Sequence, residues 1–311
     1  MVITVTLNPA MDKTLTVDNY KLGVVNRATN IRHDIGGKGV NVSKVLINFG
    51  IESTCTGFLG GIWEKDFQQE LEKRKINHKF ISIKGNTRTN TKIVDNVNKV
   101  YTDLNEAGPE IDEATLETFL IGFEDLCGAG DIVVLSGGVS ASVPVNIYGT
   151  LTAIAKRKGA LVILDADGEL LKAGLEEKPL IIKPNNHELS NLYNIDENDD
   201  DKILEAAEAL RKKGIENVLV SLGERGGFYV TAKGVYYAKG LKVNVKSTVG
   251  AGDSMVAAMV YSIINKFDEI ETLRFATACG AATVGLEGTE ACTLEQVKAL
   301  LPKVEIIKKE I

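Results

Sequence analysis

Apolar runs rich in β-branched residues recur along the chain and alternate with segments of helical periodicity. Alternating strands and helices are typical of a mostly parallel sheet, because each helix carries the chain back to the edge where the next strand begins. The pattern therefore predicts an α/β fold, with a mostly parallel central sheet flanked by helices. The predicted strands are residues 3–7, 53–58, 131–135, 160–164, 180–182 and 217–221.

Helical periodicity is clear in residues 38–49, where apolar side chains return every three or four positions. Gly50 follows directly and predicts the end of this helix, because glycine is favoured just past a helix C-terminus. Near the end of the chain, Thr293 followed by Gln296 forms a capping-box pattern, which predicts the start of a last helix.

Two segments, about 13–35 and 87–105, break the α/β rhythm. In the second, Thr89, Thr91 and Ile93 alternate with polar residues, as in a strand with one exposed face. Both segments are predicted to be strands outside the main sheet that form a small β-sheet lid over a cleft. Because no repeat, linker or low-complexity tract divides the chain, residues 1–311 are predicted to be one domain.

Charge and composition narrow the classes of partner. The 311 residues are 44% hydrophobic, enough to bury a sizeable core. Lys and Arg total 36 against 42 Asp and Glu, so the net charge of −6 lacks the basic excess of a nucleic-acid-binding protein. We expect no nucleic-acid partner, although two or three local cations would suffice for one small phosphate.

The four cysteines show no CxxC pair and no metal-like spacing, and they are expected to be reduced core residues. The apolar N-terminus lacks the pattern of a signal peptide, and no run approaches the roughly 18 apolar residues of a membrane span. A cytoplasmic protein without membrane association is therefore the expectation.

The densest chemical signal is the run Ser-Thr-Val-Gly-Ala-Gly-Asp-Ser at 247–254, which leads directly into a helical pattern. The first amides of a helix are unpaired and lie at the positive end of its dipole, so they bind anions. Gly250, Ala251 and Gly252 have little or no side chain, which would allow a phosphoryl group to approach the backbone closely. These residues are a predicted anion hole.

Asp253 would lie beside such a phosphoryl group, where its carboxylate would accept the proton of an attacking hydroxyl as a general base. A simpler interpretation is that Asp253 only complements the dipole in the first turn of the helix. Taken alone, the Gly-x-Gly-Asp run favours the simpler interpretation.

Polar residues also follow the predicted strands at the carboxyl edge of the sheet, where open α/β folds bind ligands. Asp12 would accept hydrogen bonds from sugar hydroxyls or would form an Asx turn after Pro9. Ser136 and Gly138 follow the strand at 131–135 and are also expected to reach the cleft. In the second lid segment, Arg88 would grip a phosphate through two parallel hydrogen bonds or would remain a solvated edge charge.

The run Gly-Gly-Lys-Gly-Val-Asn at 36–41 offers a close backbone approach at Gly37, a cation at Lys38 and an amide at Asn41. This set suits a sugar or its phosphate, although a structural turn with a solvated lysine is an alternative. A dinucleotide fingerprint fits poorly because Val42 stands in place of its third glycine. A Walker A loop is excluded because Arg32 and Gly39 occupy two of its required positions.

Lys183 and Asn185 follow another short strand, and Glu188 lies three residues beyond Asn185. Taken alone, the Asn-x-x-Glu pair has the pattern of a helix cap.

Four of these motifs occur in the order typical of one family. The run at 248–253 resembles the C-terminal signature of the ribokinase-like, or PfkB, carbohydrate kinases, and the run at 36–42 resembles their N-terminal signature. Residues 6–12 and 183–188 match the intervening motifs, so the resemblance spans the whole chain. It implies a ribokinase-like fold in which a sugar binds between core and lid and ATP binds across the C-terminal half.

The resemblance also implies roles for individual residues. Asp253 would be the base, Asp12 and Asn41 would hold sugar hydroxyls, and Asn185 with Glu188 would organise Mg²⁺. Lys38 and Arg88 would hold the substrate phosphate, with Gly37, Ser136 and Gly138 nearby. ATP would lie beside Lys183, Asn185, Ser221, Gly223, Gly226, Thr248, Gly280 and Thr283. Helix packing alone would explain Gly280 nearly as well.

Within the family, residues 102–106 and 247–255 most resemble the branch that phosphorylates fructose 1-phosphate to fructose 1,6-bisphosphate. Tagatose 6-phosphate and fructose 6-phosphate remain alternative substrates. A non-catalytic sugar-phosphate sensor and a dehydrogenase are rivals from other classes. The family often pairs its lids, so the resemblance also implies a homodimer through the lid.

Overall fold

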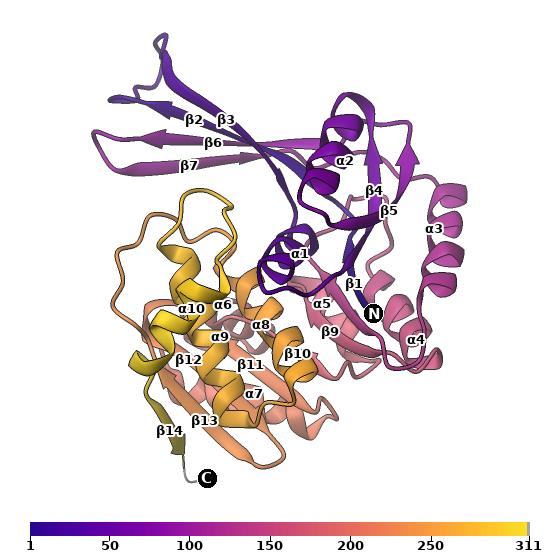
Figure 1. Cartoon of the computed structure of the whole chain (residues 1–311), viewed down its shortest axis with the longest axis vertical. Helices are drawn as coiled ribbons and strands as arrows, with labels where there is room; N and C mark the ends of the chain where they lie inside the picture. Colours follow the sequence, from indigo (N-terminus) through magenta and orange to yellow (C-terminus); the bar gives the residue numbers. More distant parts are fainter. Residues whose placement is uncertain (310–311) are drawn as a thin grey trace.

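The computed structural model describes residues 1–309, and its larger sheet has ten strands in the order β14-β13-β12-β11-β10-β9-β8-β1-β4-β5 (Figure 1). The seven strands from β11 to β5 are parallel, whereas β12, β13 and β14 continue the sheet in antiparallel fashion. The strands are β1 (Val2–Thr6), β4 (Thr54–Gly60), β5 (Asn77–Ile83), β8 (Ile132–Ser136), β9 (Leu161–Asp165), β10 (Ile181–Ile182), β11 (Asn217–Ser221), β12 (Gly226–Thr231), β13 (Gly234–Lys239) and β14 (Ile306–Lys309).

The predicted α/β fold is confirmed, and all six predicted strands exist with ends that differ by at most a few residues. Four strands of the sheet were not predicted. One of them, β5, is an edge strand with no buried residue, so it lacks the apolar run that marks the central strands. The other three form the antiparallel extension, which the alternation of strands and helices does not predict.

Helices cover both faces of the large sheet, because its central strands are apolar on both sides. In β8, Val133 and Leu135 point to one helical layer, and Ile132 and Val134 point to the other. The first layer is α3 (Glu113–Leu126), α4 (Ile147–Arg157), α5 (Gly168–Leu175), α6 (Asn186–Tyr193) and α7 (Asp200–Lys212). The second is α1 (Lys38–Asn48), α8 (Ala251–Asn265), α9 (Glu269–Val284) and α10 (Leu294–Leu300).

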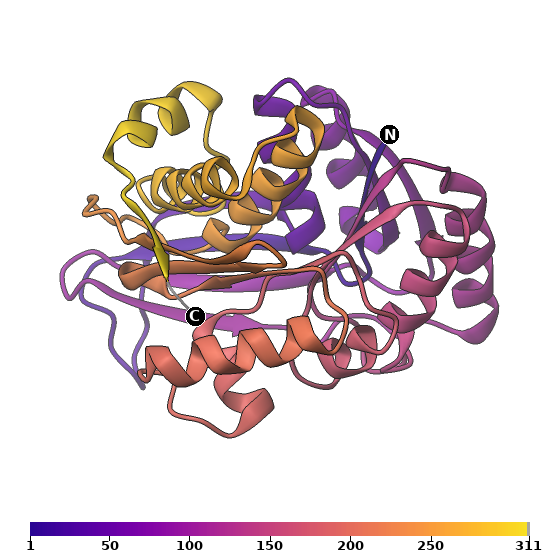
Figure 2. The same ribbon diagram turned by 90° about the horizontal axis from the view of Figure 1, so that it is seen from below.

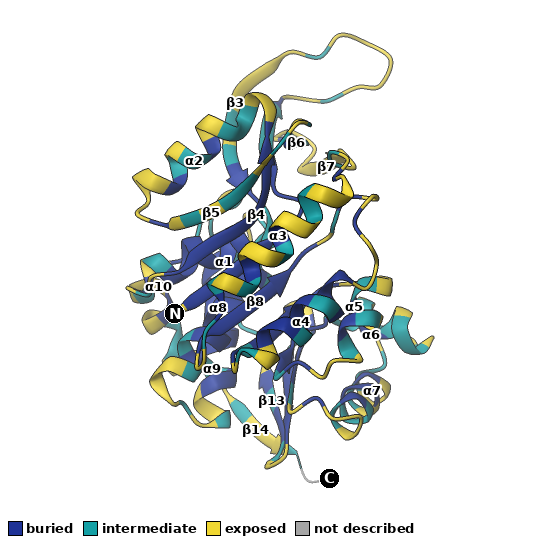
Figure 3. Cartoon of the chain, turned by 90° about the vertical axis from the view of Figure 1, so that its right-hand side faces the viewer, coloured by how far each residue is buried: buried dark blue, intermediate teal, exposed yellow. Residues whose placement is uncertain are grey.

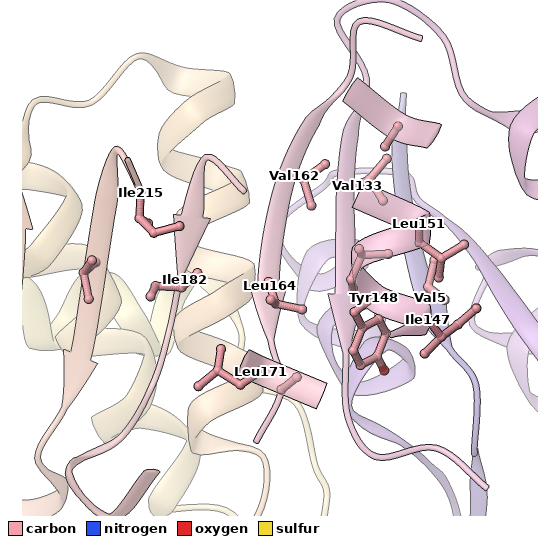
Figure 4. Close-up of a cluster of buried hydrophobic side chains, with 14 of the residues drawn as sticks. Val5, Val133, Ile147, Tyr148, Leu151, Val162, Leu164, Leu171, Ile182 and Ile215 are labelled. Atoms are coloured by element: carbon pink, nitrogen blue, oxygen red, sulfur yellow. The ribbon is translucent and has the colours of Figure 1, made fainter. Parts of the chain in front are cut away.

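The two layers are visible in Figure 2, where the yellow and orange helices near the C-terminus lie on the side of the sheet opposite α7. Figure 4 shows the core of the first layer, in which Val133 and Leu164 face Leu151 and Tyr148 of α4. The predicted helix at 38–49 is α1, and the predicted capping box of Thr293 and Gln296 begins α10.

A second sheet has four strands in the order β3-β2-β6-β7 and projects beyond the body of the molecule (Figure 1). Its outer pairs are antiparallel, and the central pair of β2 and β6 is parallel. The strands are β2 (Ala10–Val17), β3 (Ala28–Gly36), β6 (Arg88–Asp95) and β7 (Val100–Asn105). The two segments that break the α/β rhythm thus form the small sheet, which begins earlier than predicted, at Ala10.

The register of the small sheet separates two chemically different faces. One face carries the neighbouring polar residues Asp12, Thr14, Asp34, Asn90, Lys92 and Asp103. The opposite face carries Leu15, Ile31, Ile93 and Leu104, which pair with one another or with threonines. Both faces remain partly open to solvent, because no helix of residues 1–309 covers this sheet (Figure 3).

A small apolar cluster anchors the base of the small sheet to α1, β4 and α2 (Glu64–Lys73). It includes Met11 and Ile35 from the two strands nearest the body. Beside it, the indole nitrogen of Trp63, in the short 3-10 helix η1 (Gly61–Trp63), donates a hydrogen bond of 3.1 Å to Thr89 Oγ1. The ring of His33 lies 5.6 Å from the indole.

All four cysteines are buried and free, as expected. No helix within residues 1–309 combines the length and apolar composition needed to cross a bilayer. The two remaining short 3-10 helices are η2 (Gly223–Arg225) and η3 (Leu301–Lys303). The last two residues of the predicted domain, 310 and 311, lie outside the described part.

Candidate active site

A cavity of about 970 Å³ lies between the small sheet and the carboxyl edge of the large sheet. Open α/β sheets bind their ligands at this edge. The wall contributed by the small sheet is Asp12, Thr14, Asp34, Arg88, Asn90, Lys92, Asp103 and Asn105. The floor includes Gly37, Lys38, Asn41, Asp165, Lys183, Asn185, Glu188 and residues 248–253.

The predicted anion hole forms the first turn of α8. Gly250 has a φ of 81°, in the left-handed region that favours glycine, and the helix begins at the next residue. Ala251 and Gly252 follow in the first turn, where backbone amides have no partner within the helix. All three residues line the cavity, so unpaired N–H groups and the positive end of a helix dipole are available to an anion there.

Asp253 is buried beside this turn, with 6% of its surface exposed, and it lines the cavity. Its Oδ2 accepts a hydrogen bond of 2.8 Å from Asn41 Nδ2. Burial raises the pKa of Asp253 to about 6, although the nearby Lys38 opposes the shift. A carboxylate with such a pKa is ionised at neutral pH and basic enough to accept a proton.

Asp165, the last residue of β9, joins two lysines at the floor. Its Oδ1 lies 3.3 Å from Lys38 Nζ and 3.2 Å from Lys183 Nζ, and its side chain is 1% exposed. Burial alone would raise the pKa of Asp165, but the two ammonium groups hold it below its ordinary value. Burial likewise opposes the charge of Lys38, yet Asp165, Asp253 and Glu188 raise the pKa of this lysine above its ordinary value.

Asn185 and Glu188 form a capping box at the start of α6. Asn185 Oδ1 accepts from the Glu188 amide at 2.7 Å, and Glu188 Oε2 accepts from the Asn185 amide at 2.9 Å. The simpler sequence interpretation is thus correct in part, but both residues also line the cavity. Burial raises the pKa of Glu188, and its second carboxylate oxygen is not used by the cap.

Asp12 lies in β2 of the small sheet, between Asp34 and Asn90 of the neighbouring strands. Its Oδ1 accepts a hydrogen bond of 3.1 Å from Asn90 Nδ2, and burial raises its pKa. Gly36 passes so close to this carboxylate that any Cβ there would collide with it. The close approach to Asp12 therefore explains why position 36 is occupied by a glycine.

Arg88 begins β6 at the rim of the cavity and is only partly exposed. Its Nε donates to the Asn8 carbonyl and its Nη1 donates to the Glu106 carbonyl, each at 3.2 Å. Burial lowers the pKa of Arg88, because the charge is partly desolvated. The two carbonyls hold the guanidinium in place and leave further N–H groups for a ligand.

A model of the pfkB family of carbohydrate kinases matches residues 5–296. The chain belongs to this family. A 1-phosphofructokinase from Haemophilus influenzae is 35% identical over 306 residues, which cover 98% of this chain and 97% of the relative. A 1-phosphofructokinase from Bacillus subtilis is 34% identical over 308 residues, with 99% and 100% covered. The family inferred from the sequence motifs is therefore confirmed.

Solved structures agree with the ribokinase-like fold. Phosphofructokinase-2 from Escherichia coli in complex with potassium superposes with a TM-score of 0.92 at 26% identity, over 97% of this chain and 98% of that one. The same enzyme in complex with fructose-6-phosphate gives a TM-score of 0.90 at 25% identity, with the same coverage.

The structure brings most predicted site residues of this pfkB kinase into one cavity. Five residues of the predicted ATP site line it: Ser221, Gly223, Gly226, Thr248 and Gly280. Thr283 does not belong to the lining, and its Oγ1 instead lies 2.6 Å from Ser254 Oγ, between α9 and α8. It therefore supports the first turn of α8 from behind.

Ser136 and Gly138 also lie outside the cavity lining, contrary to the expectation that they reach the cleft. Ser136 is fully buried. The turn that follows is tied away from the cavity, because the Gly137 amide donates to the Asp165 carbonyl and the Gly137 carbonyl accepts from Tyr148. Gly138 is exposed but has no side chain that would reach back.

Sequence reasoning missed two charged residues, one on the floor and one beneath it. Asp165 stands directly after the predicted strand at 160–164, so the rule that selected Ser136 would also have found it. Lys44 is buried in α1, one turn after Asn41, and its position among apolar residues of the predicted helix was a signal too.

Proposed function

We propose that this pfkB kinase transfers the γ-phosphoryl group of ATP to the 6-hydroxyl of fructose 1-phosphate. The observation that carries the proposal is the position of Asp253. Its buried carboxylate, with a pKa of about 6, lies at the anion-binding turn of α8, in a cavity walled on its far side by sugar-type ligands of the small sheet. General base and anion hole thus occupy one helix turn.

The chemistry follows from this arrangement. The attacking hydroxyl forms a new P–O bond, the bond between the γ-phosphorus and its bridging oxygen breaks, and the proton of the hydroxyl passes to Asp253. Asn41 holds one carboxylate oxygen, which leaves Oδ1 of Asp253 to take the proton. The amides at the start of α8 stabilise charge on the transferred group, those of Gly250 and Gly252 above all, because the Ala251 amide already donates to the Thr248 carbonyl at 3.5 Å. This is expected where positioning and electrostatics supply most of the catalysis.

Lys38 receives a different role from the one that its motif suggested. Its ammonium group shares Asp165 with Lys183 and is influenced by Asp253 and Glu188, all on the floor of the cavity. These neighbours belong to the phosphoryl-transfer end. We therefore assign Lys38 to the charge of the transferred phosphoryl group and Lys183 to the nucleotide phosphates.

The sugar end is assigned to the small sheet. Asp12 and Asn90 form a hydrogen-bonded pair suited to sugar hydroxyls, and the second N–H of Asn41 would contact another hydroxyl. Arg88 would hold the substrate phosphate. Lys92 is a second cation on the same face, but Asp103 lies 3.5 Å from its Nζ and offsets its charge, so Arg88 is the main cation of the wall for a substrate phosphate.

The residues present fit an Mg²⁺ ion that arrives with the nucleotide. No cluster of three or more His, Cys, Asp or Glu side chains within residues 1–309 would hold a metal by itself. Glu188 nevertheless offers one free carboxylate oxygen to the cavity, and Mg²⁺ commonly combines one carboxylate with waters and phosphates. Asn185 uses its oxygen in the cap and would act only by holding Glu188. When bound, the ion neutralises phosphate charge.

The substrate is tested by comparing kcat/KM for fructose 1-phosphate, fructose 6-phosphate, tagatose 6-phosphate and free fructose under identical conditions. The 1-phosphofructokinases among the relatives support the first, and the fructose-6-phosphate in the E. coli phosphofructokinase-2 structure makes the second the main competitor. A preference for free fructose would contradict the role of Arg88. Binding of sugar phosphate without turnover would favour a sensor.

We also propose that two copies pair through the apolar face of the small sheet. Ile31 and Leu104 on that face are 54% and 57% exposed, and the edge strand β7 has no neighbour beyond it within residues 1–309. Exposed apolar patches commonly mark protein interfaces. A tetrameric form of the E. coli phosphofructokinase-2 shows that a protein of this fold self-associates.

Light scattering tests this pairing. The wild type should have about twice the 33.6 kDa mass of one chain, and Leu104→Asp should reduce it to one chain. Val145→Asp is a matched control, since Val145 is also exposed but lies far along the chain from the small sheet. A wild type of 33.6 kDa at micromolar concentration would contradict the pairing.

A further inference from the structure

Lys44 is a buried lysine beneath the proposed active site. It lies in α1 with 3% of its surface exposed, and it is not part of the cavity lining. Its Nζ donates to Asn41 Oδ1 at 3.0 Å, to Thr289 Oγ1 at 3.4 Å and to the Thr289 carbonyl at 3.5 Å. Burying an ammonium group is costly, and none of the proposed steps uses this one.

The contacts of Lys44 fix the orientation of Asn41. An ammonium group only donates hydrogen bonds and an ionised carboxylate only accepts them. With Lys44 on one side and Asp253 on the other, the amide of Asn41 must point its oxygen to the lysine and its NH₂ group to Asp253. In the reverse orientation, the NH₂ group of Asn41 would face the ammonium group of Lys44, and its oxygen would face the carboxylate of Asp253.

The same ammonium group secures a loop on the far side. Thr289 lies between α9 and α10 and lines the cavity, and Lys44 binds both its hydroxyl and its carbonyl. Close by, Arg32 of the small sheet lies 3.6 Å from Glu290. Lys44 thus connects α1, the base on α8 and a loop of the cavity wall.

We propose that Lys44 is a positioning residue for phosphoryl transfer, which holds the Asn41 amide toward Asp253 and thereby orients the free carboxylate oxygen of the base. This inference deepens the proposed function and rests on Asp253 as the general base. Because Lys44 touches neither cavity nor reacting atoms, it would act on kcat through Asn41 and leave ATP affinity unchanged.

The role of Lys44 requires its proton. A charged ammonium group has three N–H donors for its three acceptors, whereas a neutral amine has two and an acceptor lone pair. Burial and, to a smaller extent, the nearby Arg74 lower the pKa of Lys44 to about 8, although Asp12, Asp34 and Asp253 oppose the shift. As pH rises through this pKa, the orientation of Asn41 should loosen and activity should fall.

Three variants test the proposal. In Lys44→Met, kcat should fall by about 10- to 100-fold, the scale of a small misplacement of a catalytic group, with KM for ATP within about threefold of the wild type. Lys44→Arg keeps the charge at all relevant pH values and should restore much of kcat. Lys73→Met is a control, because Lys73 is an exposed lysine in α2.

The pH profile distinguishes positioning from mere structural support. Wild-type kcat/KM should decline above about pH 8, and Lys73→Met should show the same decline. In Lys44→Arg the decline should move to a higher pH, and in Lys44→Met it should disappear. Circular dichroism and thermal unfolding establish that each variant is folded. The wild-type profile remains informative if one of them is not.

Two results would overturn the inference. One is a folded Lys44→Met with wild-type kcat, and the other is a wild-type profile that stays flat from pH 7 to 10. If Asp253→Asn is inactive in the same assay, such a result rejects the role of Lys44 alone. If Asp253→Asn keeps its activity, the proposed function itself fails.

Discussion

The floor and the small-sheet wall of the cavity hold their charges in different ways. On the floor and directly beneath it, Asp165, Lys183, Asp253 and Lys44 are all less than 10% exposed, and each has a charged or amide partner within hydrogen-bond or ion-pair distance. On the opposite wall, the side chains are half-buried or exposed, and Arg88 is held by two backbone carbonyls.

This difference separates two tasks. Buried, mutually paired groups have fixed positions, and the pKa values of Asp165, Lys44 and Asp253 are shifted. Proton and phosphoryl transfer require both properties. Half-exposed groups on a sheet with solvent on both faces exchange water for ligand at low cost, which suits substrate selection. We therefore expect floor variants to change kcat and wall variants to change KM for the sugar.

The largest effect is expected for Asp253→Asn on the floor. The amide cannot accept the proton, so kcat should fall by roughly 10²- to 10⁴-fold, the usual contribution of a general base. Nucleotide affinity, measured by calorimetry, should stay within a few-fold. Turnover close to that of the wild type would show that Asp253 is not the general base. It would also contradict the expectation that floor variants change kcat.

Arg88→Ala tests the wall. Loss of one charge-assisted hydrogen-bonded contact costs about 1.5–3 kcal/mol, so kcat/KM for the sugar phosphate should fall roughly 10- to 150-fold, mainly through KM. The KM for ATP should barely change. Lys13→Ala is the matched control, because Lys13 lies in the neighbouring strand but outside the cavity lining. A loss confined to kcat would assign Arg88 to the chemical step instead.

Glu188→Gln separates metal organisation from helix capping. Glutamine accepts the same hydrogen bond at this position, as Gln296 does at the start of α10, so the cap of α6 should survive. The Mg²⁺ concentration for half-maximal rate should rise by roughly 10- to 100-fold, the usual cost of altering a group that holds or supports a metal ion. A coincident Mg²⁺ titration for variant and wild type would leave Glu188 with the structural role alone.

The smallest effect is one of stability. Because burial raises the pKa of Asp253 from 3.8 to about 6, the folded protein binds this proton more tightly than the unfolded chain does. The ionised carboxylate therefore lowers stability above pH 6, and Asp253→Asn should increase the unfolding free energy by about 1–3 kcal/mol at pH 7.5.

The same linkage gives the control for this measurement. Below about pH 3 the wild-type carboxyl is largely protonated in both states, because its ordinary pKa is 3.8. The difference in urea-unfolding free energy between variant and wild type should therefore shrink toward zero. A variant that is less stable than the wild type at pH 7.5 would show that Lys38 and Asn41 outweigh the cost of burial.

The sequence predicted the parallel core and most of the cavity for identifiable reasons. Strands buried on both faces leave continuous apolar runs, and the glycine-rich turn before α8 is a local pattern, so both can be recognised without a fold. The antiparallel extension β12–β14 leaves no such pattern in the sequence, because the pairing of these strands with β11 and with one another is determined by the tertiary structure.

Two outcomes at the site depend on long-range contacts. Lys38 stands in a motif that suggests a sugar phosphate, yet Asp165, far along the chain, draws it to the floor. Ser136 has the right place at the end of a strand, but the next residue turns the chain away, because the Gly137 amide donates to the Asp165 carbonyl and the Gly137 carbonyl accepts from the Tyr148 hydroxyl. A motif gives residue types and spacing, whereas these outcomes depend on distant partners.

Trp63 is the only tryptophan in the sequence, and it lies where the small sheet joins the body of the molecule. Its indole is hydrogen-bonded to Thr89, directly beside Arg88, and it faces the ring of His33 from a second strand of the small sheet. Any displacement of these strands changes the polarity and quenching that the indole experiences. The unlabelled enzyme therefore carries its own optical reporter, whose fluorescence would record movement of the small sheet as each substrate binds, in real time and with no other indole to obscure it.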